Sequence, residues 1–272
     1  AKKFELPIII FTEGGGGRPG DTDVLTQIAG LHIPSFSSWA QLTGTSLKIA
    51  INNGYCFAGN AALFGCSDFR IATKTSWIGM AGPAMIEGGG LGVFEPTDIG
   101  PVSVHEKNGV VDYVANNEEE ATLIAKKLLS YFQGSIEDFS ICDQEILQNV
   151  MPEDRRYTYE VRDIINTVAD QESFLELRKK YGESIATGFI RIEGKPFGLL
   201  ASDCQKLGGA IDSESAEKAA DFISICNDHA LPILVLADTP GFMVGPASEE
   251  LGAVRRMASL FKQGANIKVP LV

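Results

Sequence analysis

Short apolar runs separated by polar and glycine-containing turns organise the chain, and they alternate with segments of helical periodicity. The runs at residues 49–51, 69–72 and 76–79 are too brief for helices, so we predict strands there. Residues 121–132 place apolar side chains on one helical face behind an acidic first turn. This alternation of strands and helices predicts an α/β fold.

The second half of the chain has the same alternation. Residues 185–192 and 197–202 are predicted strands joined by a turn at residues 193–196. An alanine-rich helix is predicted over residues 216–229, and the apolar run at residues 231–236 predicts a further strand. The two halves therefore share the same kinds of element.

An internal repeat supports two domains of one fold. Residues 6–11 recur as residues 231–236, and residues 44–51 recur as residues 264–271, in the same order and at nearly the same offset. The chain starts without a lead-in and ends at Val272, where the second copy should continue, so we expect both domains to be incomplete. The expected boundaries are residues 1–133 for the first domain, 134–151 for a linker and 152–272 for the second domain.

The stretch most informative about chemistry is residues 54–61, where a small-residue turn leads from a strand into a helix. Almost nothing bulky surrounds the backbone at Ala58 and Gly59. The N-terminus of a helix presents free backbone N–H groups, which can hold an anion or an oxyanion without any side chain. The alternative is that the glycines only permit close packing of the helix on the sheet.

Composition excludes several classes of function. The formal charge of −12 argues against a nucleic-acid-binding protein, because such binding depends on cationic contacts to phosphate. No segment has the roughly 18 consecutive apolar residues of a membrane span. The five cysteines form no CxxC pair, which argues against a zinc site or a disulfide framework and favours a cytoplasmic location. Cys56 and Cys66 are expected to pack as small apolar residues.

Other candidate chemistry is weak. His32, His105 and His229 stand in no recognisable arrangement with a nucleophile and a carboxylate. The glycine-rich residues 13–21 lack the Lys-Ser or Lys-Thr of a phosphate-binding loop, and residues 88–92 lack the spacing of a dinucleotide fingerprint. We therefore expect no histidine or cysteine catalyst and no metal.

Residues 54–61, followed by residues 67–69, resemble the oxyanion loop of the biotin-dependent acyl-CoA carboxyltransferases, whose pattern is nearer GxCAGGAxxxxxxxDF. The usual Gly-Gly appears here as Ala58-Gly59. The backbone donors survive that change.

Further motifs extend the resemblance over nearly the whole chain. Gly17-Arg18 falls in register with the family's glycine-rich first loop, which is close to SGGAR. Residues 238–242 are similar to the DTPGF stretch of the family's second domain, and residues 152–163 and 208–212 resemble its opening. The β subunits of propionyl-CoA and methylcrotonyl-CoA carboxylase typify this family. The likeness is closest to the single-chain acyl-CoA carboxylases, in which biotin carboxylase, biotin carrier and carboxyltransferase share one polypeptide.

The resemblance implies a fold and a reaction. The fold would be two tandem crotonase-like β-β-α spiral domains, the first for acyl-CoA and the second for biotin. The reaction would transfer CO2 from carboxybiotin to the α-carbon of an acyl-CoA, with no protein general base. The implied partners are acyl-CoA, the biotin carboxyl carrier, the biotin carboxylase and further copies of the chain in a dimer-built oligomer or hexamer.

The resemblance also implies site residues. The amides of Ala58 and Gly59 would hold the thioester oxygen, while Gly241 and Phe242 would line the biotin site. Met80 and its neighbours would suit an apolar acyl tail, although a plain core is an equal alternative. The implied substrate-binding residues are Gly15, Gly16, Gly17, Arg18, Phe57, Asn60, Met80, Ala81 and Gly82.

Three other functions remain open on the sequence. A biotin-dependent acyl-CoA decarboxylase subunit would use the same folds and loops, and its partner subunits would identify it. A hydratase or isomerase would have a single domain with a carboxylate base, which the repeat disfavours. A non-catalytic acyl-CoA-binding or assembly module is the alternative outside enzymes.

Overall fold

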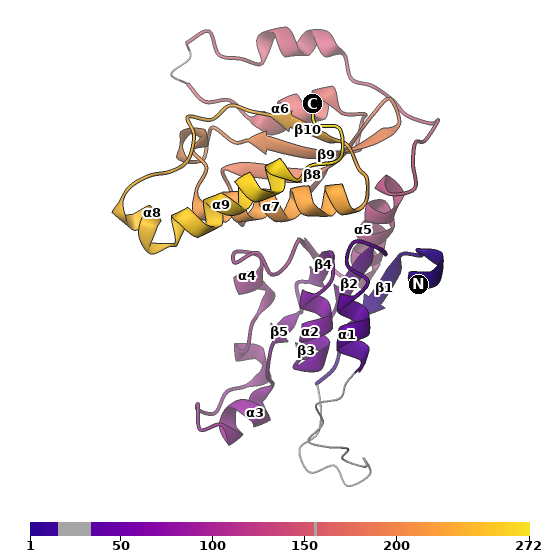
Figure 1. Ribbon diagram of the computed structural model, residues 1–272, viewed down its shortest axis with the longest axis vertical. Helices are drawn as coiled ribbons and strands as arrows, with labels where there is room; N and C mark the ends of the chain where they lie inside the picture. The colour runs from indigo at the N-terminus through magenta and orange to yellow at the C-terminus, as the bar shows by residue number, and fades with distance from the viewer. Residues whose placement is uncertain (16–33, 155–156) are drawn as a thin grey trace. The chain divides into compact units, whose positions relative to one another are not determined.

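The computed structural model describes residues 1–15, 34–154 and 157–272. The chain divides into two compact units, Ala1–Ala125 and Lys126–Val272 (Figure 1). The division falls inside helix α5 (Glu118–Tyr131), which begins in the first unit and ends in the second. We describe each unit by itself.

The first unit contains the strands that the short apolar runs predicted, and these strands pair in parallel. Its larger sheet has the order β1-β2-β4-β6, and a smaller sheet pairs β3 with β5. Every residue of β2 is buried, which explains why its centre, residues 49–51, is a continuous apolar run rather than an alternation. The strands are β1 (Ile8–Phe11), β2 (Lys48–Asn52), β3 (Tyr55–Phe57), β4 (Phe69–Thr73), β5 (Trp77–Gly79) and β6 (Tyr113–Ala115).

Short helices connect these strands. Phe64, on α2, is fully buried and packs in the core of this unit with Ala50, Cys56 and Ile78. The Asn117 side chain caps α5 by accepting the Glu120 N–H at 2.9 Å. The helices are α1 (Pro34–Ala40), α2 (Gly59–Gly65), α3 (Pro83–Gly88) and α4 (Val102–His105), with 3-10 turns η1 (Lys2–Phe4) and η3 (Pro96–Asp98).

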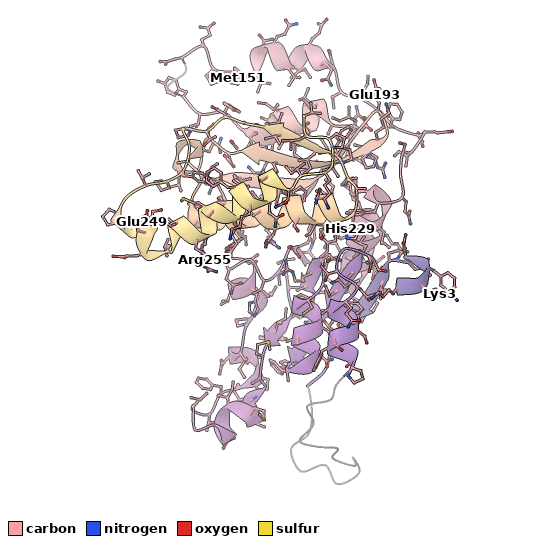
Figure 2. All side chains as sticks on the ribbon, viewed as in Figure 1. Lys3, Met151, Glu193, His229, Glu249 and Arg255 are labelled. Carbon is pink, nitrogen blue, oxygen red and sulfur yellow. The ribbon has the colours of Figure 1, made fainter. Side chains whose placement is uncertain are left out.

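The second unit has a mixed sheet of order β10-β9-β8-β7, in which β9 and β10 are parallel and the other pairs antiparallel. The hairpin predicted from the sequence is confirmed, and Figure 2 labels Glu193 at its turn. The strands are β7 (Leu175–Leu177), β8 (Ile185–Ile192), β9 (Lys195–Ser202) and β10 (Ile233–Leu236). The helices are α6 (Val161–Val168), α7 (Ser213–Asp228), α8 (Pro246–Glu250) and α9 (Ala253–Ala265), with 3-10 turns η4 (Gln144–Asn149) and η5 (Leu207–Gly209).

The two units repeat a strand pairing between the matched segments. In the first unit Ile8 pairs with Lys48, and in the second Ile233 pairs with Leu271, both in parallel. In the sequence match Lys268 corresponds to Lys48, so the second pairing lies three residues further along the chain (271 − 268). Pro270 has no N–H to donate, so this pairing uses its carbonyl and then the amide of Val272.

Candidate active site

The N-terminus of α2 is the centre of the candidate site in the first unit. Ala58 precedes the helix with φ 54° and ψ −119°, a backbone region that glycine usually occupies. Gly59 is the first helical residue, and the helix has no side-chain cap. The chain therefore turns sharply from β3 into α2, which leaves the first backbone N–H groups of the helix without intrahelical acceptors.

The two amides predicted to hold an oxyanion differ in the structure. The Ala58 N–H donates to the Gly79 carbonyl oxygen at 3.0 Å, which links β3 to β5. The Gly59 N–H has no backbone or side-chain acceptor within the described part of the chain. Only Gly59 of this pair offers a free donor.

Gly59 is also constrained by packing, as the alternative interpretation of this glycine expected. A Cβ at Gly59 would lie 2.9 Å from Cζ of Phe36, a residue of α1. Real Cβ atoms do not approach other atoms so closely, and the ring would have to shift. Glycine at this position allows α1 to pack against the start of α2 while the N–H stays open.

The strain at Ala58 gives a testable expectation. Ala58→Gly should raise the free energy of unfolding by about 1 kcal/mol, because a non-glycine residue in such a region costs about 1–3 kcal/mol and glycine entropy offsets part of that gain. Urea denaturation of both proteins measures the difference. Ala62→Gly, inside α2, is the matched control and should instead lower stability by about 1 kcal/mol. A loss of stability in both variants would contradict the strain at Ala58.

The glycine-rich first loop begins beside β3. Gly14 bridges to Cys56 in parallel, with its N–H on the Tyr55 oxygen at 2.8 Å and its carbonyl accepting the Phe57 N–H at 2.9 Å. Gly15 follows this bridge. Of the predicted substrate-binding residues, Gly16, Gly17 and Arg18 lie outside the described residues.

The other predicted substrate contacts have varied surroundings. Asn60 donates its side-chain amide to two backbone carbonyls, those of Thr12 and Glu13, each at 3.1 Å. The buried Phe57 ring packs beside Gly79 and Gly82. 

Met80 is 75 % exposed, so its alternative placement in a plain core is wrong. Ala81 and Gly82 are partly exposed beside it. Met85 is 60 % exposed in α3, so the segment after β5 presents apolar side chains on the surface.

Two cysteines and two histidines of the first and second units have well-defined surroundings in the described chain. Cys56 is buried, as predicted, and burial raises the pKa of its thiol to about 11. Cys66 is exposed, so its predicted packing is wrong, because α2 ends just before it. The ring Nε2 of His105 lies 2.7 Å from the Ile78 oxygen, and His229 stacks edge-on with Phe132.

His32 lies outside the described residues. Among the described residues, no group of three or more His, Cys, Asp or Glu side chains could hold a metal ion. No helix of the described chain is both long and apolar enough to cross a membrane.

In the second unit, the loop after β10 carries the residues predicted to meet biotin. The Gly241 N–H donates to the Thr239 hydroxyl at 3.1 Å, and the Gly241 carbonyl accepts the Ile211 N–H at 2.9 Å. The Phe242 ring packs with Phe261 and with a small cluster that includes Met257. The Phe242 N–H, for which the described chain provides no acceptor, is the open donor of this pair.

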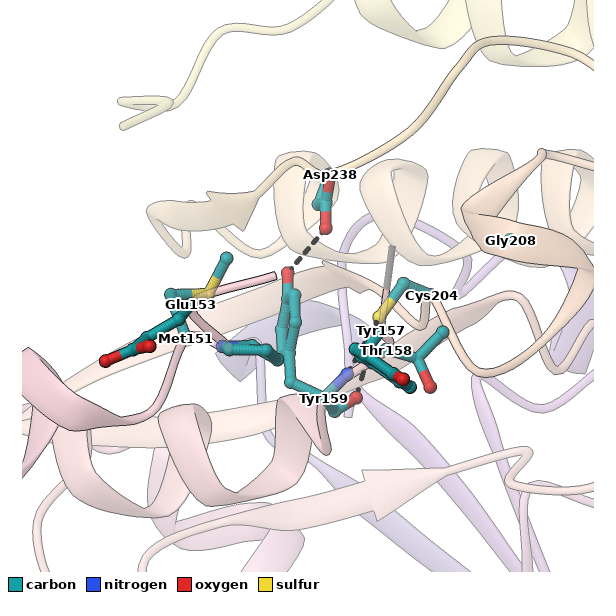
Figure 3. Close-up of a pocket in the computed structure, with 9 residues that line it drawn as sticks. Met151, Glu153, Tyr157, Thr158, Tyr159, Cys204, Gly208 and Asp238 are labelled. Atoms are coloured by element: carbon teal, nitrogen blue, oxygen red, sulfur yellow. Dashed lines mark hydrogen bonds between the residues drawn. The ribbon is translucent and has the colours of Figure 1, made fainter. Parts of the chain in front are cut away.

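A cavity of about 700 Å³ lies at the start of the same loop (Figure 3). The Tyr159 hydroxyl donates to Asp238 Oδ2 at 2.8 Å, as the dashed line in Figure 3 shows. Burial, and then this hydrogen bond, raises the pKa of Tyr159, so the hydroxyl stays protonated. Both residues lie in stretches that resemble the family, residues 152–163 and 238–242, but their sequence does not predict this hydrogen bond. The lining residues are Met151, Pro152, Glu153, Tyr157, Thr158, Tyr159, Cys204, Gly208 and Asp238.

Comparison with known proteins places these features in a family. The carboxyl transferase domain family matches residues 1–272, the entire sequence. The methylmalonyl-CoA carboxyltransferase 12S subunit of Propionibacterium freudenreichii subsp. shermanii is 28 % identical over 98 % of this chain and 52 % of its own length. The propionyl-CoA carboxylase beta chain of Rhodococcus erythropolis is 30 % identical over 98 % of this chain and 57 % of its own length.

Two solved structures are similar throughout. A single-chain, multi-domain long-chain acyl-CoA carboxylase is 49 % identical with a TM-score of 0.93, covering 97 % of this chain and 26 % of its own. The transcarboxylase 12S hexamer with methylmalonyl-CoA and methylmalonic acid bound is 27 % identical with a TM-score of 0.86, covering 99 % of this chain and 54 % of its own.

The chain belongs to the carboxyl transferase domain family. The predicted α/β fold of the crotonase-like class is confirmed by its likeness to these carboxyltransferase structures. The chain spans about half the length of the curated relatives that it matches.

Proposed function

We propose that this chain is the carboxyltransferase component of a biotin-dependent acyl-CoA carboxylase. Family membership supports the reaction class, and the open Gly59 N–H at the start of α2 is the structural observation that carries the proposal. The first unit binds the acyl-CoA and the second binds biotin. Carboxybiotin, when bound, would supply the CO2, and the ureido nitrogen freed by loss of the CO2 would be available for the α-proton.

The chain's own contribution is to hold oxygen atoms that gain negative charge. As the α-proton leaves, charge develops on the thioester oxygen, and a fixed N–H group stabilises that charge more strongly than the neutral substrate. Gly59 is the first such donor. Gly15 is the second donor in this proposal. The Gly14–Cys56 bridge places the start of the glycine loop beside β3, and Cys56 lies two residues before Ala58 in the turn into α2. The Ala58 N–H, held by Gly79, supports the turn instead.

A biotin-binding site in the second unit is proposed on the Asp238–Phe242 loop. Its Phe242 N–H is open, which fits an acceptor such as a ureido oxygen. The Gly241 N–H is occupied by Thr239, so Gly241 shapes the loop rather than donating to a ligand. 

The partners follow from the same proposal. They are a biotin carboxyl carrier, a biotin carboxylase and further copies of the chain, in the cytoplasm. A hexamer is named for the transcarboxylase relative. The two-unit organisation disfavours a single-domain hydratase or isomerase, and the carboxylase names of the relatives favour a carboxylase over a decarboxylase.

We propose a long-chain acyl-CoA as the substrate. The relative with 49 % identity is named as a long-chain acyl-CoA carboxylase. The exposed Met80 and Met85 after β5 provide apolar surface for a long tail. 

The test is a carboxylation assay of the full-length protein with its carboxylated carrier, using acetyl-CoA, propionyl-CoA and palmitoyl-CoA. We expect the highest kcat/KM with palmitoyl-CoA, by about tenfold or more, since each buried CH2 is worth about 0.8 kcal/mol. A preference for propionyl-CoA would contradict the long-chain substrate only. Acyl-CoA binding without carboxylation of any substrate would overturn the catalytic proposal in favour of a binding module.

A further inference from the structure

The Asn60 side chain ties two parts of the candidate site together. Its Nδ2 atom lies 3.1 Å from both the Thr12 and the Glu13 carbonyl oxygens, which follow β1. Asn60 itself is the second residue of α2, next to Gly59. One primary amide therefore holds the end of β1 against the first turn of the helix.

The room for this amide is provided by a glycine. A Cβ at Gly14 would lie 2.5 Å from Nδ2 of Asn60, closer than atoms can approach. The family-like pattern has alanine at the position of Asn60, and alanine could not make either hydrogen bond. This chain thus differs from the pattern at Asn60, and Gly14, which has no side chain, leaves the space that the Asn60 amide occupies.

Other hydrogen bonds hold residues 13 and 14 to the turn and the strand that precede α2. The Glu13 carboxylate accepts the Asn53 N–H at 2.5 Å, and the Gly14 backbone is bridged to β3 on both its N–H and its carbonyl. Only the Asn60 amide attaches this segment to the helix itself among the recorded side-chain contacts of the described residues.

We propose that Asn60 is a positioning residue: its amide sets the distance between the start of the glycine-rich loop and the Gly59 N–H. It acts through the backbone and does not contact the substrate, unlike the binding role predicted from the sequence. This inference rests on the proposed function, since the two backbone segments matter together only if both face the same thioester oxygen. A misplacement of about 1 Å at such a site can cost about 100-fold in rate.

The test compares Asn60→Ala and Asn60→Asp in the full-length protein. Asp keeps the size but replaces the donor with oxygens that face two carbonyls, so it should be the more damaging change. We expect kcat to fall about 10-fold or more in both variants. The KM for acyl-CoA should stay within about threefold of the wild-type value, because Asn60 does not itself contact the substrate.

Gly14→Ala gives an independent route to the same effect, because its Cβ would displace the Asn60 amide without altering Asn60. The double variant Gly14→Ala/Asn60→Ala should be much less impaired than the product of the two single effects, since the clash is gone. If the loss of kcat in the double variant equals the product of the two single losses, the contact between Gly14 and Asn60 does not matter for the reaction and the proposal fails. Unchanged kcat in folded Asn60→Asp would overturn the positioning role.

Hydrogen exchange of the amides of residues 12–15 separates this inference from the proposed function. Exchange should become faster in Asn60→Ala than in the wild type whether or not the protein carboxylates acyl-CoA. Absence of carboxylation by the wild type would defeat the proposed function alone. Unchanged exchange in an active protein would defeat the anchoring by Asn60 alone.

Discussion

Replacing Gly59 by proline is expected to lower kcat for acyl-CoA carboxylation by about 10²–10³-fold, the usual cost of removing one oxyanion donor. The substitution deletes the open N–H at the start of α2. Proline is tolerated at the first position of a helix, where no intrahelical bond is lost, so the variant should still fold. Steady-state kinetics of the full-length protein measures the effect, and circular dichroism checks the fold.

The matched control is Gly59→Ala. Its Cβ meets the Phe36 ring as the proline ring would, at 2.9 Å from Cζ, but the N–H remains. The difference in kcat between the two variants therefore reports the donor alone. Equal activity of the two variants would show that the Gly59 N–H does not serve the reaction and that the glycine is there for packing.

The second large effect concerns stability. Arg162→Met is expected to lower the free energy of unfolding by about 3–5 kcal/mol, because it leaves carboxylates without their partner in a largely buried place. Arg162 contacts both carboxylate oxygens of Glu176, at 3.0 and 2.5 Å, and reaches Asp203 at 2.7 Å. The side chain of Asp203 is only 2 % exposed. Glu160, at 3.1 Å, is more exposed and contributes less.

Chemical denaturation of the two proteins at neutral pH tests this expectation. The bond to Glu176, then that to Asp203, raises the pKa of Arg162, so the guanidinium is charged in the wild type. Equal stability of Arg162→Met and the wild type would contradict the explanation. Arg162→Lys keeps the charge without the planar fork and should be intermediate.

Much of the fold could be predicted because local signals and tertiary packing agree. The hairpin of β8 and β9 is a largely apolar pair of strands around a Gly-containing turn, and the centre of β2, residues 49–51, is a continuous apolar run because the strand is buried throughout. The helix at Ser213–Asp228 begins beside Asp212, whose side chain caps it. In each case the local sequence contains both the element and a signal for its boundary, such as the turn of the hairpin or the cap of the helix.

The candidate site was predictable only in part, because hydrogen-bond partners depend on residues distant in sequence. The sequence shows small residues at Ala58 and Gly59 but cannot show that Gly79 occupies the first amide. Likewise, the role of Asn60 depends on two carbonyls 47 and 48 residues earlier. The repeat likewise shows which segments correspond but not their strand register, which differs between the units because Pro270 lacks a donor.

The Phe36 ring beside Gly59 gives the candidate oxyanion donor a spectroscopic signature. One Gly59 α-proton occupies the direction in which a Cβ would lie 2.9 Å from Cζ of that ring. The magnetic field of the aromatic ring therefore displaces the resonance of this proton from the usual glycine range. The signal of this one glycine in a ¹³C-resolved NMR spectrum thus reports how closely α1 lies against the residue that carries the open N–H.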